Sequence, residues 1–315
     1  MANENPFEGT PEIDLSNTCL EKGCLDGEVA VVTGSTSNVG MGFARALAWA
    51  GAKVVVCGRN ETRGNAVKDI INKESGEGSA IFVRCDVTKE EDVKNLSKKA
   101  FEAFGKVDIL INNAMNLALN GTVLDSPIED LDMSYAISAR GSMLTIKEFV
   151  PGMIERHHGY VTYSSTQFNF LPPMLGGSMY TAGKSAATSL TMSLANEVKD
   201  KGVKVFCFCP AGVGQINPES VESMDDVDEM QLSMPGFPGL IPADASGAAM
   251  VYSLLHADEI HGSGVIVSEA LIAMGYPFPV PETAKPSDSP RIEDPFAITM
   301  MFCNMGKNYK ALSKE

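Results

Sequence analysis

The sequence is poor in positive charge, with 25 Lys and Arg against 40 Asp and Glu and a formal net charge of −15. A phosphate backbone or an anionic membrane surface is bound by clustered Lys and Arg, and the sequence has no such cluster. It also lacks an apolar run of the ~20 residues that span a bilayer. Residues 1–17 lack the basic start and apolar run of a secretory signal. We therefore expect a cytoplasmic protein that binds neither nucleic acid nor membrane.

The sequence has only seven cysteines, and an odd number cannot all pair in disulfides within one chain. Four of the cysteines lie in or beside short apolar runs typical of buried strands, where free Cys behaves as a small hydrophobe. The spacing Cys207-x-Cys209 does not indicate a metal, because alternate strand residues face opposite ways and no histidine is close in sequence. We expect free thiols and no metal site.

What the sequence does contain is an alternation of short β-branched runs with longer helical patterns. The chain has 315 residues, of which 44% are hydrophobic, so it can build a large α/β domain. The runs lack strict period-two alternation, as expected for parallel strands covered by helices on both faces. We predict an α/β, doubly wound Rossmann-type fold with a seven-stranded parallel sheet. The predicted strands are residues 28–33, 53–58, 80–85, 107–112, 159–164, 203–208 and 264–268.

The predicted domain covers residues 27–270, and neither end of the chain builds a second one. Residues 1–26 form a polar, acidic N-terminal extension, and residues 271–315 a Pro-rich tail that contains "FAITMMF". The segment 216–246 is rich in Met, Pro and acidic residues and is too long for an ordinary connection. We interpret it as a substrate lid.

The first predicted strand runs into "TGSTSNVGMG" (33–42) and then into a helical pattern. This is the strand, Gly-rich turn and helix order of a dinucleotide site. Glycines let the backbone approach a pyrophosphate, and the helix N-terminus offers N–H groups and the positive end of the helix dipole. A tight turn that holds no ligand is the alternative interpretation.

The second predicted strand ends in Gly58 and Arg59, where such a fold meets the adenosine ribose. A carboxylate there would bind the free 2′-OH of NAD, whereas an Arg accepts the 2′-phosphate of NADP. The missing acid at Gly58 favours NADP(H), and NAD(H) remains possible. Ser37 stands against this preference, because NADP users often carry Arg or Lys at that loop position.

Tyr180 and Lys184 in "SMYTAGKS" (178–185) are four residues apart, so on a helix they project from one face and can serve one site. The spacing alone is equally compatible with an exposed Lys beside a half-buried Tyr. The remaining motifs decide between the two: "CDVT" (85–88), "NNAM" (112–115), the Ser pair in "TYSST", and "CPAGV" (209–213).

Taken in chain order, these motifs resemble those of the short-chain dehydrogenases/reductases over residues 27–270. The resemblance implies that Tyr180 is the general acid/base, that Lys184 holds the nicotinamide ribose and lowers the Tyr pKa, and that Ser165 polarises the carbonyl, with Ser164 as the fallback. The loop, the strand ends and the resemblance together give the expected cofactor contacts: Gly34, Ser37, Asn38, Val39, Gly40, Arg59, Asp86, Val87, Asn113, Ala114, Tyr180, Lys184, Pro210, Gly212 and Val213.

The sequence departs from the family pattern at several of these sites. Asn38 replaces a loop glycine, Met115 replaces the glycine after "NNA", and Gln215 replaces a Thr that often contacts the carboxamide. The Asn that organises a water relay is replaced by Ser138. We expect Ser138 to bind water but to be too short to hold the helix distortion and the relay in the same way.

The resulting prediction is an oxidoreductase that interconverts a ketone and a secondary alcohol, with NADP(H) favoured. Apolar residues between Ser165 and Tyr180 and in the lid favour a bulky hydrophobic substrate such as a steroid, and the N-terminal extension weakly resembles that of bacterial hydroxysteroid dehydrogenases. The alternative is a catalytically weak structural or regulatory subunit. Enoyl reduction is disfavoured, because that branch places six residues between Tyr and Lys. The resemblance also implies a homodimer or homotetramer.

Overall fold

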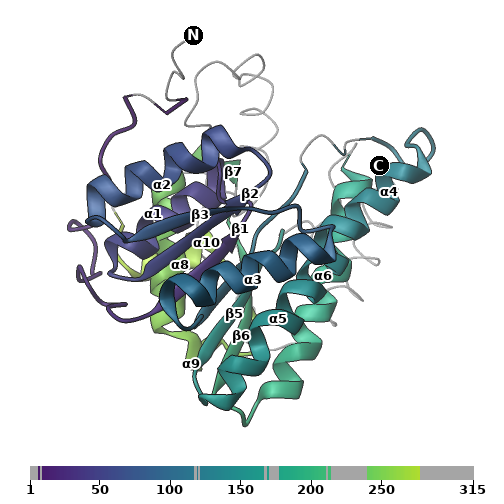
Figure 1. Cartoon of the computed structure of the whole chain (residues 1–315). Helices are drawn as coiled ribbons and strands as arrows, with labels where there is room; N and C mark the ends of the chain where they lie inside the picture. The colour runs from purple at the N-terminus through teal and green to yellow at the C-terminus, as the bar shows by residue number, and fades with distance from the viewer. Residues whose placement is uncertain are drawn as a thin grey trace, which may run out of the picture.

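The computed structural model describes residues 6–7, 9–116, 119, 121–166, 169, 177–210, 212–213 and 240–276. Within these ranges, seven parallel strands form one sheet in the order β3-β2-β1-β4-β5-β6-β9 (Figure 1). The predicted doubly wound sheet is therefore confirmed. Its strands are β1 (Val29–Thr33), β2 (Lys53–Gly58), β3 (Ala80–Arg84), β4 (Ile109–Asn112), β5 (Gly159–Ser164), β6 (Val203–Cys209) and β9 (Gly264–Ile266).

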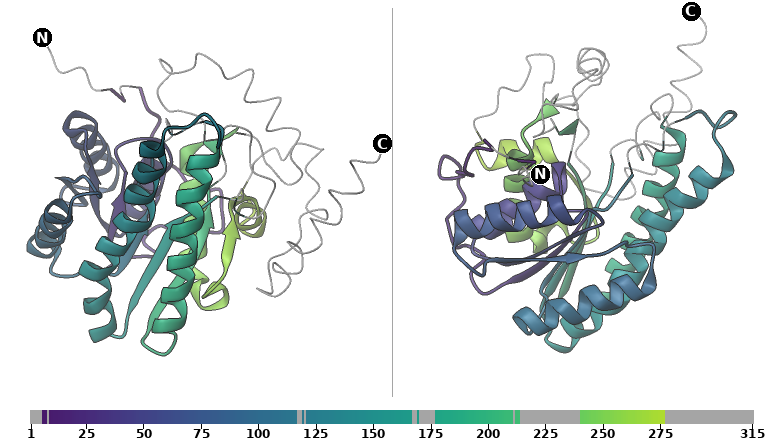
Figure 2. Two further views of the ribbon diagram at one scale, coloured as in Figure 1. Left: turned by 90° about the vertical axis from the view of Figure 1, so that its right-hand side faces the viewer. Right: turned by 45° about the horizontal axis from the view of Figure 1, so that its top comes forward.

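Helices cover both faces of the sheet, as Figures 1 and 2 show. One layer contains α1 (Asn38–Trp49), α2 (Glu61–Ser75), α8 (Ala243–Leu255) and α10 (Val267–Ala273). The other contains α3 (Glu90–Phe104), α4 (Ile128–Tyr135), the π-helical turn η1 (Ala136–Arg140), α5 (Gly141–Glu155) and α6 (Ser178–Val198). A short helix, α9 (Ala257–Ile260), precedes β9, and two short strands, β7 (Gly212–Val213) and β8 (Leu240–Ile241), pair apart from the main sheet.

Strand β1 shows why the sequence runs are apolar without alternation. Ala30 and Val32 point into the core that contains α1 and α8, and Val29 and Val31 point into the core that contains α3 and α5. All five residues of β1 are buried. A strand covered on both sides has no solvent face, so no polar residue is required at alternate positions.

The order of the strands reverses beside β1, and this reversal determines where a crevice opens in the sheet. The chain moves outward from β1 through β2 to β3, then returns to place β4 on the other side of β1. At such a reversal the loops after the two central strands leave in opposite directions, which opens a crevice at the carboxyl ends of the strands.

The N-terminal segment packs onto the domain, although its composition is polar. Its apolar residues join the core of α1, α8 and α10; they are Phe7, Ile13, Leu15, Leu20 and Leu25. Arg45 of α1, only 1% exposed, ties this segment to the rest. Its guanidinium donates to the carbonyl oxygen of Pro11 at 2.6 Å and pairs with Glu74 of α2 and Asp244 of α8.

The described residues also refine the other predicted boundaries. Strand β9 ends at Ile266, two residues earlier than predicted, because α10 begins at Val267. Helix α10 crosses the boundary drawn after residue 270, and Leu271 and Met274 are buried. Residues 240–246 of the predicted lid belong to β8 and the start of α8, while 216–239 and the tail from 277 onward, with "FAITMMF", lie outside the described residues.

The six cysteines within the described ranges are free thiols, as predicted, and Cys303 lies outside them. No helix in these ranges is both long and apolar enough to cross a membrane.

Candidate active site

The Gly-rich loop after β1 is packed backbone to backbone. Gly34 has a φ of 66°, and a Cβ at this position would lie 2.8 Å from the Cα of Ala114. A Cβ at Gly40 would lie 2.4 Å from the carbonyl oxygen of Gly34. Asn38 takes the left-handed backbone that a glycine would otherwise supply, with φ 44°. The turn therefore survives the loss of this glycine.

The N-terminus of α1 is left open toward this loop. Its N-cap residue, Ser37, makes no side-chain capping bond, and the first turn, which includes Val39, has no acidic residue. The first N–H groups of a helix have no partner within the helix, and together with the helix dipole they favour an anion. The loop and helix therefore fit the pyrophosphate of a dinucleotide.

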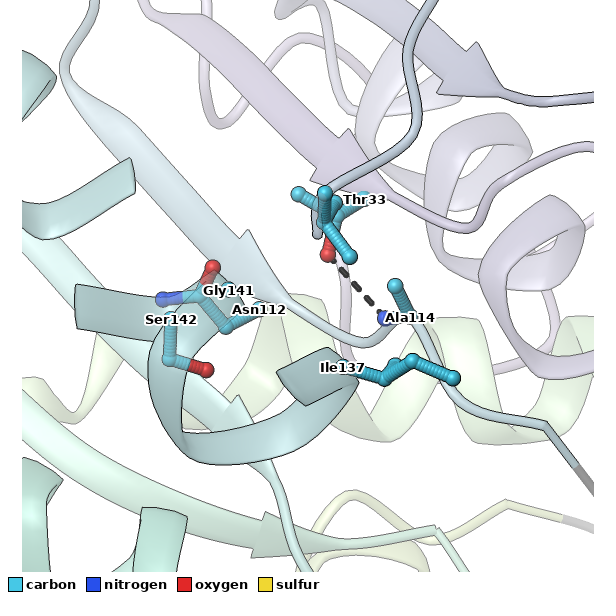
Figure 3. A pocket seen from close by; sticks show the side chains of 7 residues that line it. Thr33, Asn112, Ala114, Ile137, Gly141 and Ser142 are labelled. Atoms are coloured by element: carbon cyan, nitrogen blue, oxygen red, sulfur yellow. Dashed lines mark hydrogen bonds between the residues drawn. The ribbon is translucent and has the colours of Figure 1, made fainter. Parts of the chain in front are cut away.

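A small pocket lies at the crevice between β1 and β4 (Figure 3). Thr33 organises its rim, since the Thr33 Oγ1 accepts hydrogen bonds from the backbone N–H groups of Asn113 at 2.8 Å and Ala114 at 3.0 Å. The Asn113 side chain in turn donates to the carbonyl oxygen of Thr33 at 3.0 Å. The lining residues are Thr33, Val87, Asn112, Ala114, Ile137, Gly141 and Ser142.

Gly58 ends β2, Arg59 follows it and Asp86 lies after β3, and these three residues are the ones expected to contact the adenosine. A Cβ at Gly58 would lie 2.7 Å from Cγ2 of Thr36, so an acidic side chain at residue 58 requires Thr36 to move. Arg59 is exposed. Burial acts to raise the pKa of Asp86, but hydrogen bonds from Thr88 and the charge of Arg59 bring it below its ordinary value.

Tyr180 and Lys184 lie one turn apart on α6, as predicted. Lys184 is 3% exposed, and its ammonium donates to the carbonyl oxygen of Ser164 at the end of β5. The Nζ atom lies 5.0 Å from the centroid of the Tyr163 ring and 5.7 Å from that of Tyr180. Helix α6 packs closely against α4 at Gly183, where a Cβ would lie 2.1 Å from Oγ of Ser134. The absence of a side chain at Gly183 allows this approach.

Burial dominates the titration of this pair. It lowers the pKa of Lys184 to about 8. It raises the pKa of Tyr180 to about 12, opposed by a hydrogen bond from the Thr166 side chain. The expected lowering of the Tyr180 pKa by Lys184 is therefore not observed in the protein alone, since desolvation of the phenol is the larger effect.

Ser165 is buried at the end of β5, but its hydroxyl forms hydrogen bonds with residues other than Tyr180. Its Oγ lies 2.7 Å from Oγ1 of Thr188 on α6 and accepts a hydrogen bond of 3.0 Å from Nδ2 of Asn169. Thr166, the next residue, is the one whose side chain contacts the Tyr180 phenol. The sequence reasoning missed Thr166, Asn169 and Thr188. The run of three hydroxyl residues in "SST" could have indicated Thr166, but no sequence pattern indicated Asn169 or Thr188.

The segment after β6 approaches the same edge of the sheet. The carbonyl oxygen of Pro210 accepts a hydrogen bond of 3.4 Å from Ser246 in α8. Gly212 and Val213 form β7, which pairs with β8. Ala211 and Gln215, and the apolar residues predicted to meet the substrate except Met179, lie outside the described residues.

Ser138 lies in the π-helical turn η1 and is fully buried. A π turn is present there with Ser in place, so the helix distortion does not require an Asn side chain at this position. The Ser138 hydroxyl donates to Sδ of Met115 at 3.3 Å. Two of the departures from the family pattern therefore contact each other.

Comparisons with known proteins agree with this geometry. Residues 28–224 match the sequence profile of the family described as short chain dehydrogenase. The chain is 31% identical over 206 residues to the "(21S)-21-acetoxyl-apo-melianone synthase SDR" of Melia azedarach, covering 63% of this chain and 74% of that one.

Solved structures with the same fold include a 7-alpha-hydroxysteroid dehydrogenase complexed with NADH and 7-oxo glycochenodeoxycholic acid, with TM-score 0.70, 24% identity, and coverage of 81% of this chain and 97% of that one. A 3-ketoacyl-(acyl-carrier-protein) reductase from Brucella melitensis complexed with NADH gives TM-score 0.68 and 26% identity, and covers 77% and 97%. With the profile match over most of the Rossmann domain, these findings place the chain in the short-chain dehydrogenase/reductase family.

Proposed function

We propose that the protein is an NAD(P)(H)-dependent oxidoreductase that interconverts a ketone and a secondary alcohol. The observation that carries this proposal is that the dinucleotide crevice after β1 and β4 and the Tyr180–Lys184 pair, which binds the end of β5, lie at the same edge of the sheet. The carboxyl ends of parallel strands are where ligands bind in open α/β sheets. A cofactor and a carbonyl substrate can therefore meet there.

A bound nicotinamide would supply a hydride to the carbonyl carbon, or accept one from the alcohol carbon. Tyr180 gives its phenolic proton to the carbonyl oxygen during reduction and takes it back during oxidation. Its pKa of about 12 keeps the phenol protonated at neutral pH, which suits reduction. Lys184, held by the Ser164 carbonyl beside the phenol, favours the ionised form that oxidation requires.

NADP(H) is the preferred cofactor in this proposal. Arg59 is exposed at the carboxyl end of β2 and offers a charge-assisted contact to a 2′-phosphate. Gly58 carries no carboxylate for a free 2′-OH, and the contact with Thr36 opposes one. Ser37 supplies no second positive charge for the 2′-phosphate. The preference for NADP(H) is therefore incomplete, and NAD(H) still binds.

The proposed substrate is a bulky apolar ketone or alcohol, of which a steroid is one example. The support is compositional: the chain between Ser165 and Tyr180 contains several Met, Leu and Phe residues, and the segment 216–239 contains the apolar residues Met224, Met230, Leu232, Met234 and Phe237. The 7-alpha-hydroxysteroid dehydrogenase complex holds a ligand of this class on the same fold.

The test is a panel of ketones and alcohols assayed with NADPH and with NADH. Turnover of an apolar ketone, faster with NADPH, is the expected result. Cofactor binding with no turnover across the panel would instead favour the second candidate, a catalytically weak subunit. That candidate draws on Asn38, Met115 and Ser138, three of the departures from the family pattern.

We also propose a homo-oligomer, formed through the helices within residues 128–156 and 178–200. Large apolar side chains are exposed on and beside the first of these: Val123, Leu124, Ile128, Met133, Tyr135 and Met143. Contiguous exposed apolar residues of this kind are typical of an interface.

A further inference from the structure

The hydroxyl of Ser165 belongs to a closed network between the end of β5 and α6. Nδ2 of Asn169 donates to Oγ of Ser165 at 3.0 Å and to Oγ1 of Thr188 at 2.9 Å, and those two oxygens lie 2.7 Å apart. Ser185 donates to Oδ1 of Asn169 at 2.9 Å, which orients the amide with its N–H groups toward the two hydroxyls. Ser165 is 1% exposed.

Counting protons in this network shows where the Ser165 proton goes. Thr188 donates its only hydroxyl proton to the carbonyl oxygen of Lys184 at 2.8 Å, the common back-bond of a helical Thr. The 2.7 Å contact between Ser165 and Thr188 therefore has Ser165 as its donor. Asn169 donates to Ser165 and can take no proton from it through that bond. Ser165 has no proton left for a substrate carbonyl.

The direction of the Ser165 side chain agrees with this count. Besides Thr188, the Ser165 hydroxyl lies beside the thiol of Cys209 on β6. The Ser165 side chain thus faces β6 and the second turn of α6. Thr166, 6% exposed, has its side chain at the Tyr180 hydroxyl instead.

We infer that Thr166, and not Ser165, is the residue whose hydroxyl holds the substrate carbonyl beside Tyr180. The inference rests on the proposed function and names a further catalytic residue within it. A hydroxyl beside the acid/base phenol can donate to the carbonyl oxygen while the phenol donates its own proton to the same oxygen, so that both donors converge on the atom where negative charge develops. Asn169 is a positioning residue, because it holds Ser165 in the network and out of the substrate site.

The inference assigns no proton transfer to Thr166. Its hydroxyl donates a hydrogen bond that strengthens as the carbonyl oxygen gains charge, while the proton itself comes from Tyr180. Since threonine is branched at Cβ, its χ1 angle is more restricted than that of serine. The Thr166 oxygen therefore has fewer positions open to it without a substrate than a serine oxygen would have.

The experiment compares four variants on any ketone that the native protein reduces: Thr166→Val, Thr166→Ser, Ser165→Ala and Tyr180→Phe. Thr166→Val keeps the shape and removes the hydroxyl, and we expect kcat to fall about 10²–10³-fold. Thr166→Ser restores the donor, so its kcat stays within about tenfold of native. Ser165→Ala is expected to stay within the same range. Cofactor dissociation constants and unfolding midpoints are measured for each.

A loss of 10²-fold or more in kcat for Ser165→Ala, with a native-like unfolding midpoint, overturns the inference whatever Thr166→Val does. Should Thr166→Val fold poorly, Thr166→Ala replaces it in the comparison. Near-native turnover of a folded variant without the Thr166 hydroxyl also overturns the inference. If Tyr180→Phe loses activity in either of these two cases, only the assignment of the hydroxyl has failed. If Tyr180→Phe keeps its activity, the proposed function itself is contradicted.

Discussion

The ammonium of Lys184 lies over the ring of Tyr163, 5.0 Å from its centroid, and is held by the carbonyl oxygen of Ser164. An aromatic face and a carbonyl dipole attract a cation, but they do not replace the water lost on burial. Burial lowers the pKa of Lys184 to about 8, from 10.5 for an ordinary lysine. The charge of this residue is therefore sensitive to pH in the alkaline range.

This shift predicts a pH-dependent stability difference between the native protein and Lys184→Met. The folded pKa lies below the unfolded one, so between about pH 8 and pH 10.5 the unfolded state binds more protons, and the free energy of unfolding of the native protein rises with pH. Methionine does not titrate. We expect the native protein to gain stability relative to Lys184→Met as pH rises through this window, measured as the difference in denaturation midpoints. A difference in denaturation midpoint that does not change with pH would contradict the lowered pKa of Lys184.

The replacement Tyr180→Phe tests the acid/base. It removes the proton donor and keeps the ring, so we expect kcat to fall about 10²–10⁴-fold, with little change in the dissociation constant of the cofactor. Tyr163→Phe is the matched control, since it also removes a buried phenol beside Lys184. Equal losses in the two variants would argue for a packing effect.

Cofactor preference depends on Arg59. We expect Arg59→Ala to weaken NADPH binding about tenfold or more and NADH binding only slightly, because only NADPH carries the 2′-phosphate. Lys53→Ala removes a positive charge at the opposite end of the same strand, β2, and serves as the control for net charge. Titration of the native protein and both variants with each cofactor gives the dissociation constants required. Comparable affinities of the native protein for NADPH and NADH would refute the preference.

The contact between Ser138 and Met115 predicts that the two residues are coupled. Ser138 is fully buried against the Met115 sulfur, so the larger Ser138→Asn is expected to destabilise the protein by roughly 1–3 kcal/mol and to lower kcat. Met115→Gly makes room for the amide, and the double variant should recover part of both losses. Additive effects in this double-mutant cycle would mean that the contact has no energetic weight. Ser138→Ala should cost less activity than Tyr180→Phe.

The proposed interface can be tested with charges. We expect Met133→Glu combined with Met143→Glu to dissociate the oligomer, because both side chains are more than two-fifths exposed and a carboxylate is costly to bury. Light scattering distinguishes the oligomer from a 33.6 kDa monomer. Leu255→Glu, a similar change on the opposite helical layer, is the control. A native protein that is already monomeric would end this proposal.

The fold could be predicted because its signals are local. Apolar β-branched runs mark strands buried on both faces, and the Gly-rich turn after β1 marks a close approach of backbones that only glycine allows at Gly34 and Gly40. Tyr180 and Lys184 could be predicted for a similar reason, since their spacing on a single helix fixes their geometry.

The rest of the site depends on contacts between elements distant in sequence. Ser165 has the right residue type in the right motif, yet Thr188, 23 residues later, engages its hydroxyl. The pKa of Tyr180 could not be predicted from the spacing of the pair, because desolvation of the phenol depends on what surrounds it. The burial of the N-terminal segment was missed because five apolar residues spread over a polar stretch have no period of two or 3.6.

That N-terminal segment has a consequence for how the chain completes its fold during synthesis. It is made well before some of its partners: Cys19 donates its backbone N–H to the carbonyl oxygen of Met274 at 3.3 Å, and Arg45, which donates to the Pro11 carbonyl oxygen, also pairs with Asp244. The segment therefore cannot reach its full set of contacts until α8 and α10 have left the ribosome, some 250 residues later. Two stretches that are made far apart in time therefore close the domain together.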